Sequence, residues 1–342
     1  MAKRATAQDV ADLAGVSRTT VSFVLNDVPG MRISEETRQA VLKAATQLNY
    51  HPDATARRMV SGQTMVIGFV MRQSPEQAFA DLFLPQVLNG LNQAASDEGY
   101  HILLQPISPD DNSGAYIRLL RERHVDGIVL SGPRSDDQEL LKIHAEGAPI
   151  VLLGRLPGKD IPFVDVDNIG GAHLATQHLA KLGHRRIAMI TNAPPEYTAS
   201  TARLTGYRQT LEEASIAFDE SLVRYGNFTP QSGSLAMNEL LSLDPLPTAV
   251  FVASDTVALG AIQSIRNHKL RIPDDISVIG FDDISPAEFL DPPLATVRLP
   301  AYGLGWGAAN MLIRLIANEE VKNRRVFLET HLIVRESCGQ LT

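Results

Sequence analysis

The chain has 342 residues, of which 44% are hydrophobic and 20% charged, with one cysteine and a net charge of −8. This composition is typical of a globular protein of two or three domains. A single cysteine cannot form an internal disulfide, and no stretch of the sequence approaches the ~18 apolar residues that a membrane span needs. The negative net charge argues against DNA binding by the surface as a whole. However, residues 1–62 carry a net charge of +2 and residues 63–342 one of −10, as expected of a DNA-binding head on an acidic body.

Two short helices joined by a tight turn at Gly15 are predicted near the N-terminus. Thr6 and Asp9 have the spacing of a capping box for the first helix, and Ser17 can cap the second. Helices this short are unstable alone, so they must pack on each other. We assign their apolar faces to Val10, Leu13, Ala14, Val21, Val24 and Leu25. This is the pattern of a helix-turn-helix, whose second helix enters the DNA major groove.

An ordinary helical hairpin is the alternative, and the outward face of the second helix argues against it. With the valines buried, that face consists of Arg18, Thr19, Ser22 and Phe23. Arginine and threonine are suited to base edges and phosphates, and a phenylalanine without a core to join can contact a thymine methyl group.

A third helix is predicted from Ser34, and it ends before Pro52, since the residue preceding a proline leaves the helical region. Its apolar stripe is Val41, Leu42, Ala45 and Leu48. Residues 53–59 have little apolar surface, so we expect one or two helical turns there that become ordered only on DNA. We therefore divide the chain into a head (1–52), a hinge and linker (53–64) and a body (65–342).

From Met65 onward, strand-like apolar runs alternate with helical stretches, which predicts a doubly wound α/β body with parallel sheets. Its length favours two lobes, with the ligand bound in the cleft at the carboxyl ends of the strands. The expected strands are 65–70, 101–105, 127–130, 150–153, 186–190, 249–253 and 278–281. The expected helices are 83–99, 114–123, 136–146, 170–182, 202–214, 231–241 and 256–267.

Motifs of enzymes and cofactor sites are not found in the sequence. There is neither a phosphate-binding loop nor a nucleophile elbow. The glycines between Gly303 and Gly307 have the wrong spacing for a dinucleotide site and indicate close helix packing. His173, His178 and His184 share no helix face, which disfavours a metal site. We predict no enzyme activity, no cofactor and no metal.

Several motifs in a fixed order carry a resemblance to a known family. They are Asp9–Ser17, Thr20–Ser22 with Asn26, Leu48–Pro52 followed by Ala56 and Arg57, Asp167–Asn168, Leu182–Ile187, Arg203–Tyr207, Asp255 with Ala258–Gly260, and Val278–Asp282. Together they resemble the lac repressor (LacI/GalR) family of bacterial transcription regulators over essentially the whole chain. The resemblance implies an all-α helix-turn-helix head with a hinge helix and a two-lobed body similar to periplasmic sugar-binding proteins.

For DNA, the resemblance implies a homodimer that reads a pseudo-palindromic double-stranded operator. The residues implied to contact it are Thr6, Ser17, Arg18, Thr19, Thr20, Ser22, Phe23, Asn26, Tyr50, Ala56, Arg57 and Met59. Two of them depart from the family pattern. Met59 replaces the usual leucine wedge of the hinge helix, and it can also open a base step. Phe23 stands where many members carry arginine, which implies a different base preference.

For the effector, Arg203 and Asp282 match the family's two polar anchors. A guanidinium and a carboxylate facing each other across a cleft can bind vicinal hydroxyls or a nucleobase edge; the alternative is a structural ion pair that bridges the lobes. The effector site implied by the resemblance comprises Phe83, Leu84, Arg203, Phe228, Ser254 and Asp282. We interpret Asp255 as a helix N-cap instead.

The expected function is therefore a repressor whose operator affinity is controlled by a small molecule, expected to be a sugar or sugar derivative, through a shift between lobe orientations. A solute-binding protein without DNA function and an activator of the same architecture remain alternatives. The N-terminus lacks a secretory signal, so we expect a cytoplasmic protein without membrane contact. The apolar run Val326–Val334 is not followed by a leucine heptad, which implies a dimer and not a tetramer.

Overall fold

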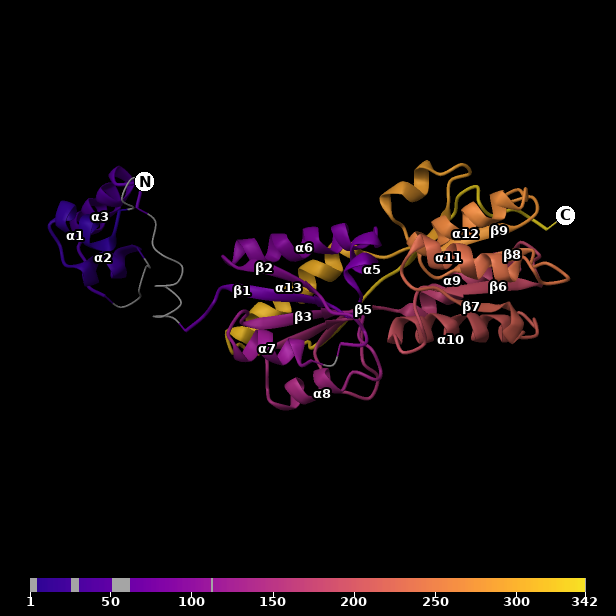
Figure 1. The fold of residues 1–342 in the computed structure, drawn as a ribbon, viewed down its shortest axis with the longest axis horizontal. Coiled ribbons are helices and arrows are strands. Elements are labelled where there is room, and N and C mark those ends of the chain that lie inside the picture. Colours follow the sequence, from indigo (N-terminus) through magenta and orange to yellow (C-terminus); the bar gives the residue numbers. More distant parts are fainter. Residues whose placement is uncertain (1–4, 26–30, 51–61, 112, 342) are drawn as a thin grey trace. The chain divides into compact units, whose positions relative to one another are not determined.

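The computed structural model describes residues 5–25, 31–50, 62–111 and 113–341. The chain forms two compact units, Met1–Met65 and Val66–Thr342, which are a small helical head and a larger α/β body (Figure 1).

The head contains three helices, α1 (Ala7–Ala14), α2 (Arg18–Leu25) and α3 (Glu35–Gln47). The predicted capping box is confirmed, because the Asp9 amide donates to the Thr6 hydroxyl (3.3 Å) and the Thr6 amide donates to the Asp9 carboxylate (2.7 Å). Ser17 caps α2 through the Thr20 amide (3.1 Å). Gly15 ends α1 at a φ of 66°, a left-handed conformation that glycine adopts at little cost.

The core of the head is built from the apolar sides of all three helices, with Val10, Val21 and Val41 buried at its centre. Two assignments to this core are wrong. Leu13 and Leu42 have exposed fractions of 48% and 40%, because each lies on the side of its helix that turns away from the other two helices.

The body has two sheets of six strands each. The first sheet has the order β11-β5-β4-β3-β1-β2 and the second β12-β10-β9-β8-β6-β7. The strands of the first lobe are β1 (Val66–Met71), β2 (His101–Pro106), β3 (Gly127–Ser131), β4 (Ile150–Leu153), β5 (Phe163–Val166) and β11 (Arg325–Leu328). Those of the second are β6 (Ile187–Thr191), β7 (Val223–Tyr225), β8 (Ala249–Val252), β9 (Ser277–Asp282), β10 (Ala295–Arg298) and β12 (His331–Ile333).

Helices cover both sheets, as the alternating sequence pattern predicts. The first lobe contains α5 (Pro75–Ala80), α6 (Leu84–Asp97), α7 (Ala115–Arg121), α8 (Gln138–Ala145) and α13 (Ala301–Ile316). The second contains α9 (Asn168–Lys181), α10 (Thr198–Glu213), α11 (Pro230–Leu240) and α12 (Asp255–Asn267), with the 3₁₀ turns η1 (Glu220–Leu222) and η2 (Ser285–Phe289). The central strands are buried on both faces, which is why they read as continuous apolar runs.

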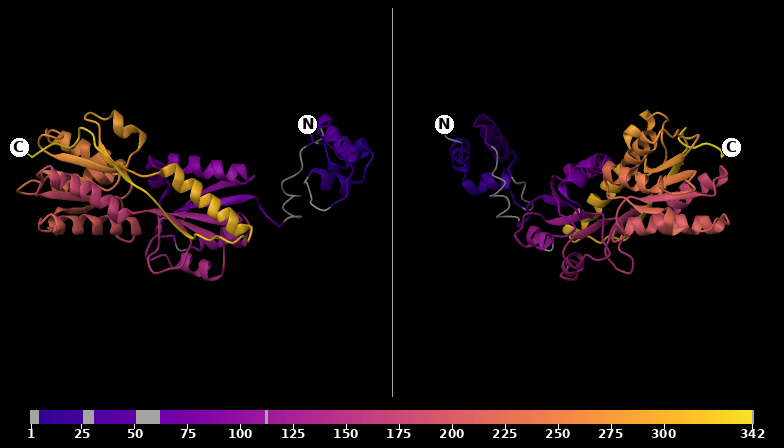
Figure 2. Two further views of the ribbon diagram at one scale, coloured as in Figure 1. Left: turned by 180° about the vertical axis from the view of Figure 1, so that it is seen from behind. Right: turned by 45° about the vertical axis from the view of Figure 1, so that its right-hand side comes forward.

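The last apolar run of the sequence does not form one element. Its first part is β11, which pairs parallel to β5 in the first lobe, whereas β12 pairs antiparallel to β10 in the second. Between β11 and β12 the chain crosses from the first lobe to the second. Figure 2 shows this C-terminal segment, in yellow, after α13. Local apolar pattern carries no information about which sheet a short strand joins, so the sequence could not reveal this division.

Helix α13 packs closely on α6. A Cβ added at Gly305 would meet the carbonyl oxygen of Val87, and one added at Gly90 would meet that of Tyr302. The prediction that the glycines around Gly305 serve helix packing is confirmed, since only glycine allows the two backbones to approach this closely. Among the helices of the described ranges, none has the length and apolar character that a membrane crossing requires.

Candidate functional site

In the head, the predicted DNA-contact residues differ in exposure. Arg18 and Thr19 are exposed at the start of α2, while Ser22 and Phe23 on the same helix are half-buried. These four residues lie on one surface of α2, as expected of a recognition helix, while Val21 and Val24 of the same helix are buried in the core of the head.

Other predicted contact residues have structural roles in the head. The hydroxyls of Thr6 and Ser17 cap helices, and the Thr20 hydroxyl lies 2.9 Å from that of Ser17. Tyr50 packs against the core. The remaining four, Asn26, Ala56, Arg57 and Met59, lie outside the described residues, as does most of the predicted hinge.

In the body, the six predicted effector residues line one cavity between the two lobes. Phe83 and Leu84 reach it from the first lobe, at the start of α6. The second lobe contributes Arg203, Phe228, Ser254 and Asp282. The cavity lies at the carboxyl ends of the strands, where open α/β sheets bind ligands.

Arg203 is the central polar group of this cavity. It projects from α10, has an exposed fraction of 6%, and donates to the side-chain oxygen of Asn168 (2.9 Å) and to the carbonyl oxygen of Ala253 (2.6 Å). Its guanidinium carbon lies 3.9 Å from the centre of the Phe281 ring. Burial lowers the pKa of Arg203, whereas the neighbouring carboxylates, Asp282 first, act in the opposite direction. These contacts hold the guanidinium in one orientation.

Asp282 ends β9 and has its nearest oxygen 3.9 Å from Arg203 Nη1. Both residues belong to the second lobe, so the expectation that they face each other across the cleft, or bridge the lobes, is wrong. The reason is that β6, which leads into α10, and β9 flank β8 in the same sheet. Burial raises the pKa of Asp282 well above its ordinary value, against the effect of Arg203. Its φ of 117° is rare for a residue other than glycine, and such strain concentrates at binding sites.

Two more carboxylates line the same cavity, and sequence reasoning missed both. Asp81 follows α5 and Asp165 lies on β5, and burial raises the pKa of each to about 6. Asp165 could have been predicted as a ligand-site residue, because it lies near the carboxyl end of a buried strand, where open α/β sheets bind ligands. Among the residues that the structure describes, the charged side chains that line the cavity are thus three carboxylates and one guanidinium.

Asp255 is not the N-cap of α12. The cap position is Ser254, and its side chain makes no capping bond. The fully buried Asp255 carboxylate instead accepts hydrogen bonds from the Thr296 hydroxyl (2.8 Å) and the Ile284 amide (3.0 Å). These hydrogen bonds connect the start of α12 to β10 and to the segment that follows β9. Burial raises the pKa of Asp255 to about 7.

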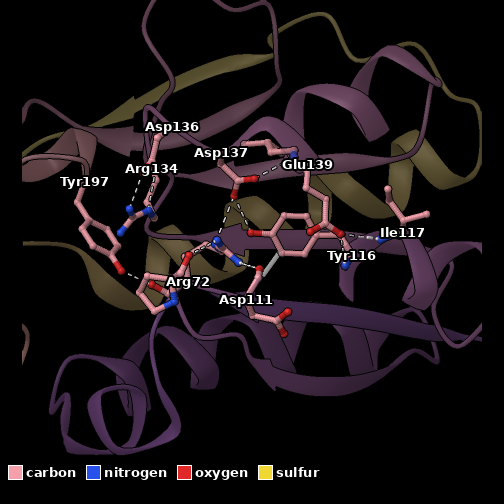
Figure 3. A network of polar contacts seen from close by, with 11 residues as sticks. Arg72, Asp111, Tyr116, Ile117, Arg134, Asp136, Asp137, Glu139 and Tyr197 are labelled. Carbon is pink, nitrogen blue, oxygen red and sulfur yellow. Dashed lines mark hydrogen bonds and ion pairs between the residues drawn. The ribbon is translucent and has the colours of Figure 1, made fainter. Parts of the chain in front are cut away.

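Tyr197 is a further lining residue that the sequence did not reveal. It precedes α10, and its ring contacts that of Phe228 edge-to-face with ring centres 4.9 Å apart. Its hydroxyl donates to the carbonyl oxygen of Arg72, which follows β1 in the first lobe. Figure 3 shows Tyr197 beside Arg134, whose guanidinium lies over the tyrosine ring, with Arg72 nearby.

The network around Arg72 belongs to the first lobe. Arg72 is 4% exposed, donates to the Pro109 carbonyl oxygen (2.8 Å), and has its Nε 3.4 Å from the Asp137 carboxylate. Asp137 also accepts from the Tyr116 hydroxyl (2.7 Å) (Figure 3). This network holds the Arg72 carbonyl in place as an acceptor for Tyr197.

Asn192, also in the cavity wall, has an exposed fraction of 8% and a side-chain oxygen without a hydrogen-bond partner. A buried acceptor without a donor is costly, and a ligand with hydroxyl groups can supply one. Within the described ranges, no group of three or more histidine, cysteine or acidic side chains is arranged to hold a metal ion.

Comparison with known proteins agrees with this architecture. The family model "Bacterial regulatory proteins, lacI family" matches residues 6–53, and "Periplasmic binding protein-like domain" matches residues 176–338. The HTH-type transcriptional regulator CelR of Thermobifida fusca is 39% identical over 98% of this chain and 98% of its own.

Two solved structures extend the likeness to three dimensions. The structure of the transcriptional regulator CelR-cellobiose complex is 38% identical, with a TM-score of 0.75, and the match covers 98% of this chain and 100% of that one. The lac repressor dimer bound to operator and the anti-inducer ONPF is 28% identical, with a TM-score of 0.85, covering 99% and 100%. The similarity spans the head and the body alike, so the chain belongs to the lacI family of bacterial regulatory proteins and is a DNA-binding transcription regulator.

Proposed function

We propose that the protein is a homodimeric repressor whose affinity for a pseudo-palindromic operator is controlled by a neutral saccharide bound in the interlobe cavity. The observation that carries the choice of effector is the polar lining. Asp81, Asp165 and Asp282 surround a single guanidinium, that of Arg203. An ionised carboxylate accepts hydrogen bonds and a protonated carboxyl also donates one, so a ligand with several groups that both donate and accept suits this lining.

A polyhydroxylated ring meets this requirement better than a nucleobase, which has few N–H donors. The aromatic rings of Phe83, Tyr197 and Phe228 provide apolar surface for the faces of such a ring. A phosphorylated sugar is disfavoured, because two like charges 4 Å apart repel each other by about 4 kcal/mol at an effective dielectric constant of 20. The relative whose structure contains cellobiose supports a saccharide and makes cellobiose the first compound to test.

The proposed control of DNA binding follows from the two sides of the cavity. A ligand that contacts Phe83 and Leu84 in one lobe and Arg203 in the other stabilises one lobe orientation over others. In a dimer, that orientation changes the fit of the two heads to their half-sites. Allosteric coupling of this kind is typically ~1–3 kcal/mol, or roughly 5–150-fold in affinity. The dimeric lac repressor on its operator supports this arrangement.

In the head, we assign direct base contacts to Arg18, Thr19 and Phe23 on the outer face of α2. For Asn26, Ala56, Arg57 and Met59, which lie outside the described residues, we propose the DNA contacts that the resemblance implies, those of the last three in the minor groove. We propose that the body binds its ligand without transforming it.

The test is selection of the full-length protein on random double-stranded DNA at physiological salt, followed by titration of the selected operator complex with cellobiose, glucose, glucose 6-phosphate and hypoxanthine. Enrichment of two inverted half-sites and a response to a neutral sugar are expected. Arg203→Ala should abolish the response while operator binding persists, and Arg208→Ala, an exposed arginine on the same helix, should respond as the parent. A response to hypoxanthine or the phosphorylated sugar alone would refute the assignment of the effector.

A further inference from the structure

A second cavity adjoins the effector cavity. It lies between the loop that follows β4 in the first lobe and the first turns of α10 in the second. Its volume is about 520 Å³, whereas that of the effector cavity is about 130 Å³. Ligand-binding pockets span roughly 300–1,000 Å³, and the second cavity falls within this range, so it has room for a part of the ligand that extends beyond the effector cavity.

The two cavities share part of their walls. Gly154, Asp165, Asn168 and Ala199 line both of them. Gly154 and Ala199 have the smallest side chains of the common wall, so little side-chain bulk stands between the cavities there. A ligand seated against Arg203 can therefore extend past Ala199 into the second cavity.

Asp165 supplies a free acceptor at this junction. Its Oδ1 accepts hydrogen bonds from the Val166 amide (2.8 Å) and from the Asn168 side chain (3.0 Å). Its Oδ2 accepts none from the described residues, and the Nε of Arg155 lies 4.0 Å from it. The carboxylate is held in place by one oxygen and leaves the other available to a ligand hydroxyl.

The second cavity has the lining of a binding site for a hydroxylated ligand. Thr198, Thr201 and Thr205 contribute from successive turns of α10. The Thr201 hydroxyl donates to the Pro195 carbonyl oxygen (2.7 Å) and that of Thr205 to the Thr201 carbonyl oxygen (2.8 Å), so both oxygens still have lone pairs for a ligand donor.

The opposite wall belongs to the first lobe. Arg155 and Lys159 supply N–H donors, and Leu156 and Pro157 supply apolar surface. Donors on one side and acceptors on the other match a second sugar unit, whose hydroxyls both donate and accept hydrogen bonds.

We propose that the two cavities form one elongated site and that the effector is an oligosaccharide of at least two units. The first unit binds in the effector cavity, the linkage passes Ala199 and Asp165, and the second unit binds between Arg155 and the threonines of α10. This inference rests on the proposed function, since it specifies the length of the neutral saccharide and the residues that recognise its second unit.

The experiment is isothermal titration calorimetry of the full-length protein with a panel of monosaccharides (glucose, galactose, xylose) and disaccharides (cellobiose, lactose, maltose, xylobiose). Thr201→Trp fills the second cavity from an exposed position of α10. Gln209→Trp is the matched control, because Gln209 is exposed on the same helix and lines neither cavity.

The parent protein and Gln209→Trp should bind the best disaccharide at least tenfold more tightly than any monosaccharide. Thr201→Trp should lose at least tenfold in disaccharide affinity and keep its monosaccharide affinity within twofold. A disaccharide bound no more tightly than a monosaccharide, or unaffected by Thr201→Trp, overturns the second subsite and leaves the saccharide effector in place. Absence of binding by every sugar overturns the proposed function and the subsite together.

Discussion

The hydroxyl of Tyr197, in the second lobe, donates a hydrogen bond to the backbone carbonyl of Arg72, in the first lobe. The segment that contains Tyr197 is also joined to the segment that follows β3 in the first lobe. The Ser135 amide donates to the Glu196 carbonyl (2.8 Å), and the Thr198 amide donates to the Pro133 carbonyl (3.2 Å). Because Tyr197 also lines the effector cavity, one residue contacts the ligand site and joins the two lobes.

Polar contacts also join the lobes at a second place along the cavity wall. The Leu82 amide donates to the Thr256 hydroxyl (3.2 Å), and Phe83 packs against the core of the second lobe. The lobe orientation described here is therefore supported by contacts at two places along the cavity wall, around Tyr197 and around Thr256.

Replacement of Tyr197 by phenylalanine tests this coupling. Tyr197→Phe keeps the ring against Phe228 but removes the donor to Arg72. We expect a 2- to 10-fold loss of saccharide affinity, since a hydrogen bond contributes a net ~0.5–1.5 kcal/mol. Calorimetry is the measurement, with Tyr225→Phe as control because Tyr225 is 47% exposed on β7. Unchanged affinity in Tyr197→Phe would show that this bond does not stabilise the ligand-bound orientation.

Opposite changes in stability are expected at two glycines of α13. A methyl group at Gly305 would meet the backbone of α6 at Val87, whereas one at Gly307 makes ordinary contacts of 3.5 Å with the Val164 side chain. Gly305→Ala should lower the free energy of unfolding by about 1–3 kcal/mol. Gly307→Ala should raise it by up to ~1 kcal/mol, since alanine favours the helix. Urea denaturation followed by the fluorescence of Trp306, the single tryptophan, measures both, and equal shifts would contradict the close packing.

The buried Asp255 carboxyl predicts a dependence of stability on pH. Its pKa is about 7 in the folded protein and near the ordinary value of 3.8 in the unfolded chain. The stability supplied by its protonated form is complete below about pH 4, falls by up to about 1.4 kcal/mol per pH unit above that, and is lost as the pH rises through about 7.

Asp255→Asn should therefore reduce the loss of unfolding free energy between pH 5 and pH 7 in urea titrations. Asp219→Asn is the control, because hydrogen bonds from the side chain and backbone of Ser221 lower the pKa of Asp219, so that this carboxyl does not titrate in the same window. Identical slopes for the parent and Asp255→Asn would rule out Asp255 as the source.

The separation into two compact units predicts that the body folds alone. A chain that lacks residues 1–62 should unfold cooperatively, bind the saccharide with unchanged affinity, and show no binding to the selected operator. Calorimetry and a gel-shift assay measure the two properties. Specific operator binding by the truncated chain would place DNA-recognition determinants in the body.

The sequence by itself determined the features that depend on near neighbours along the chain. Thr6, Ser17 and Ser34 mark helix starts because a cap acts within three residues. The alternation of apolar runs predicted the α/β body, since a buried strand and an amphipathic helix differ in local period. The six effector residues, named from a resemblance, do come together in one cavity, and their role in binding stays a prediction.

Only the tertiary structure decided the features that depend on partners far along the chain. It placed Arg203 and Asp282 in the same lobe, and it sent β11 and β12 to different sheets. It gave Asp255 a buried bonding role and brought Tyr197 to Arg72, 125 residues away. These outcomes are set by which strands pair and which surfaces meet, and a local pattern of residues does not encode that choice.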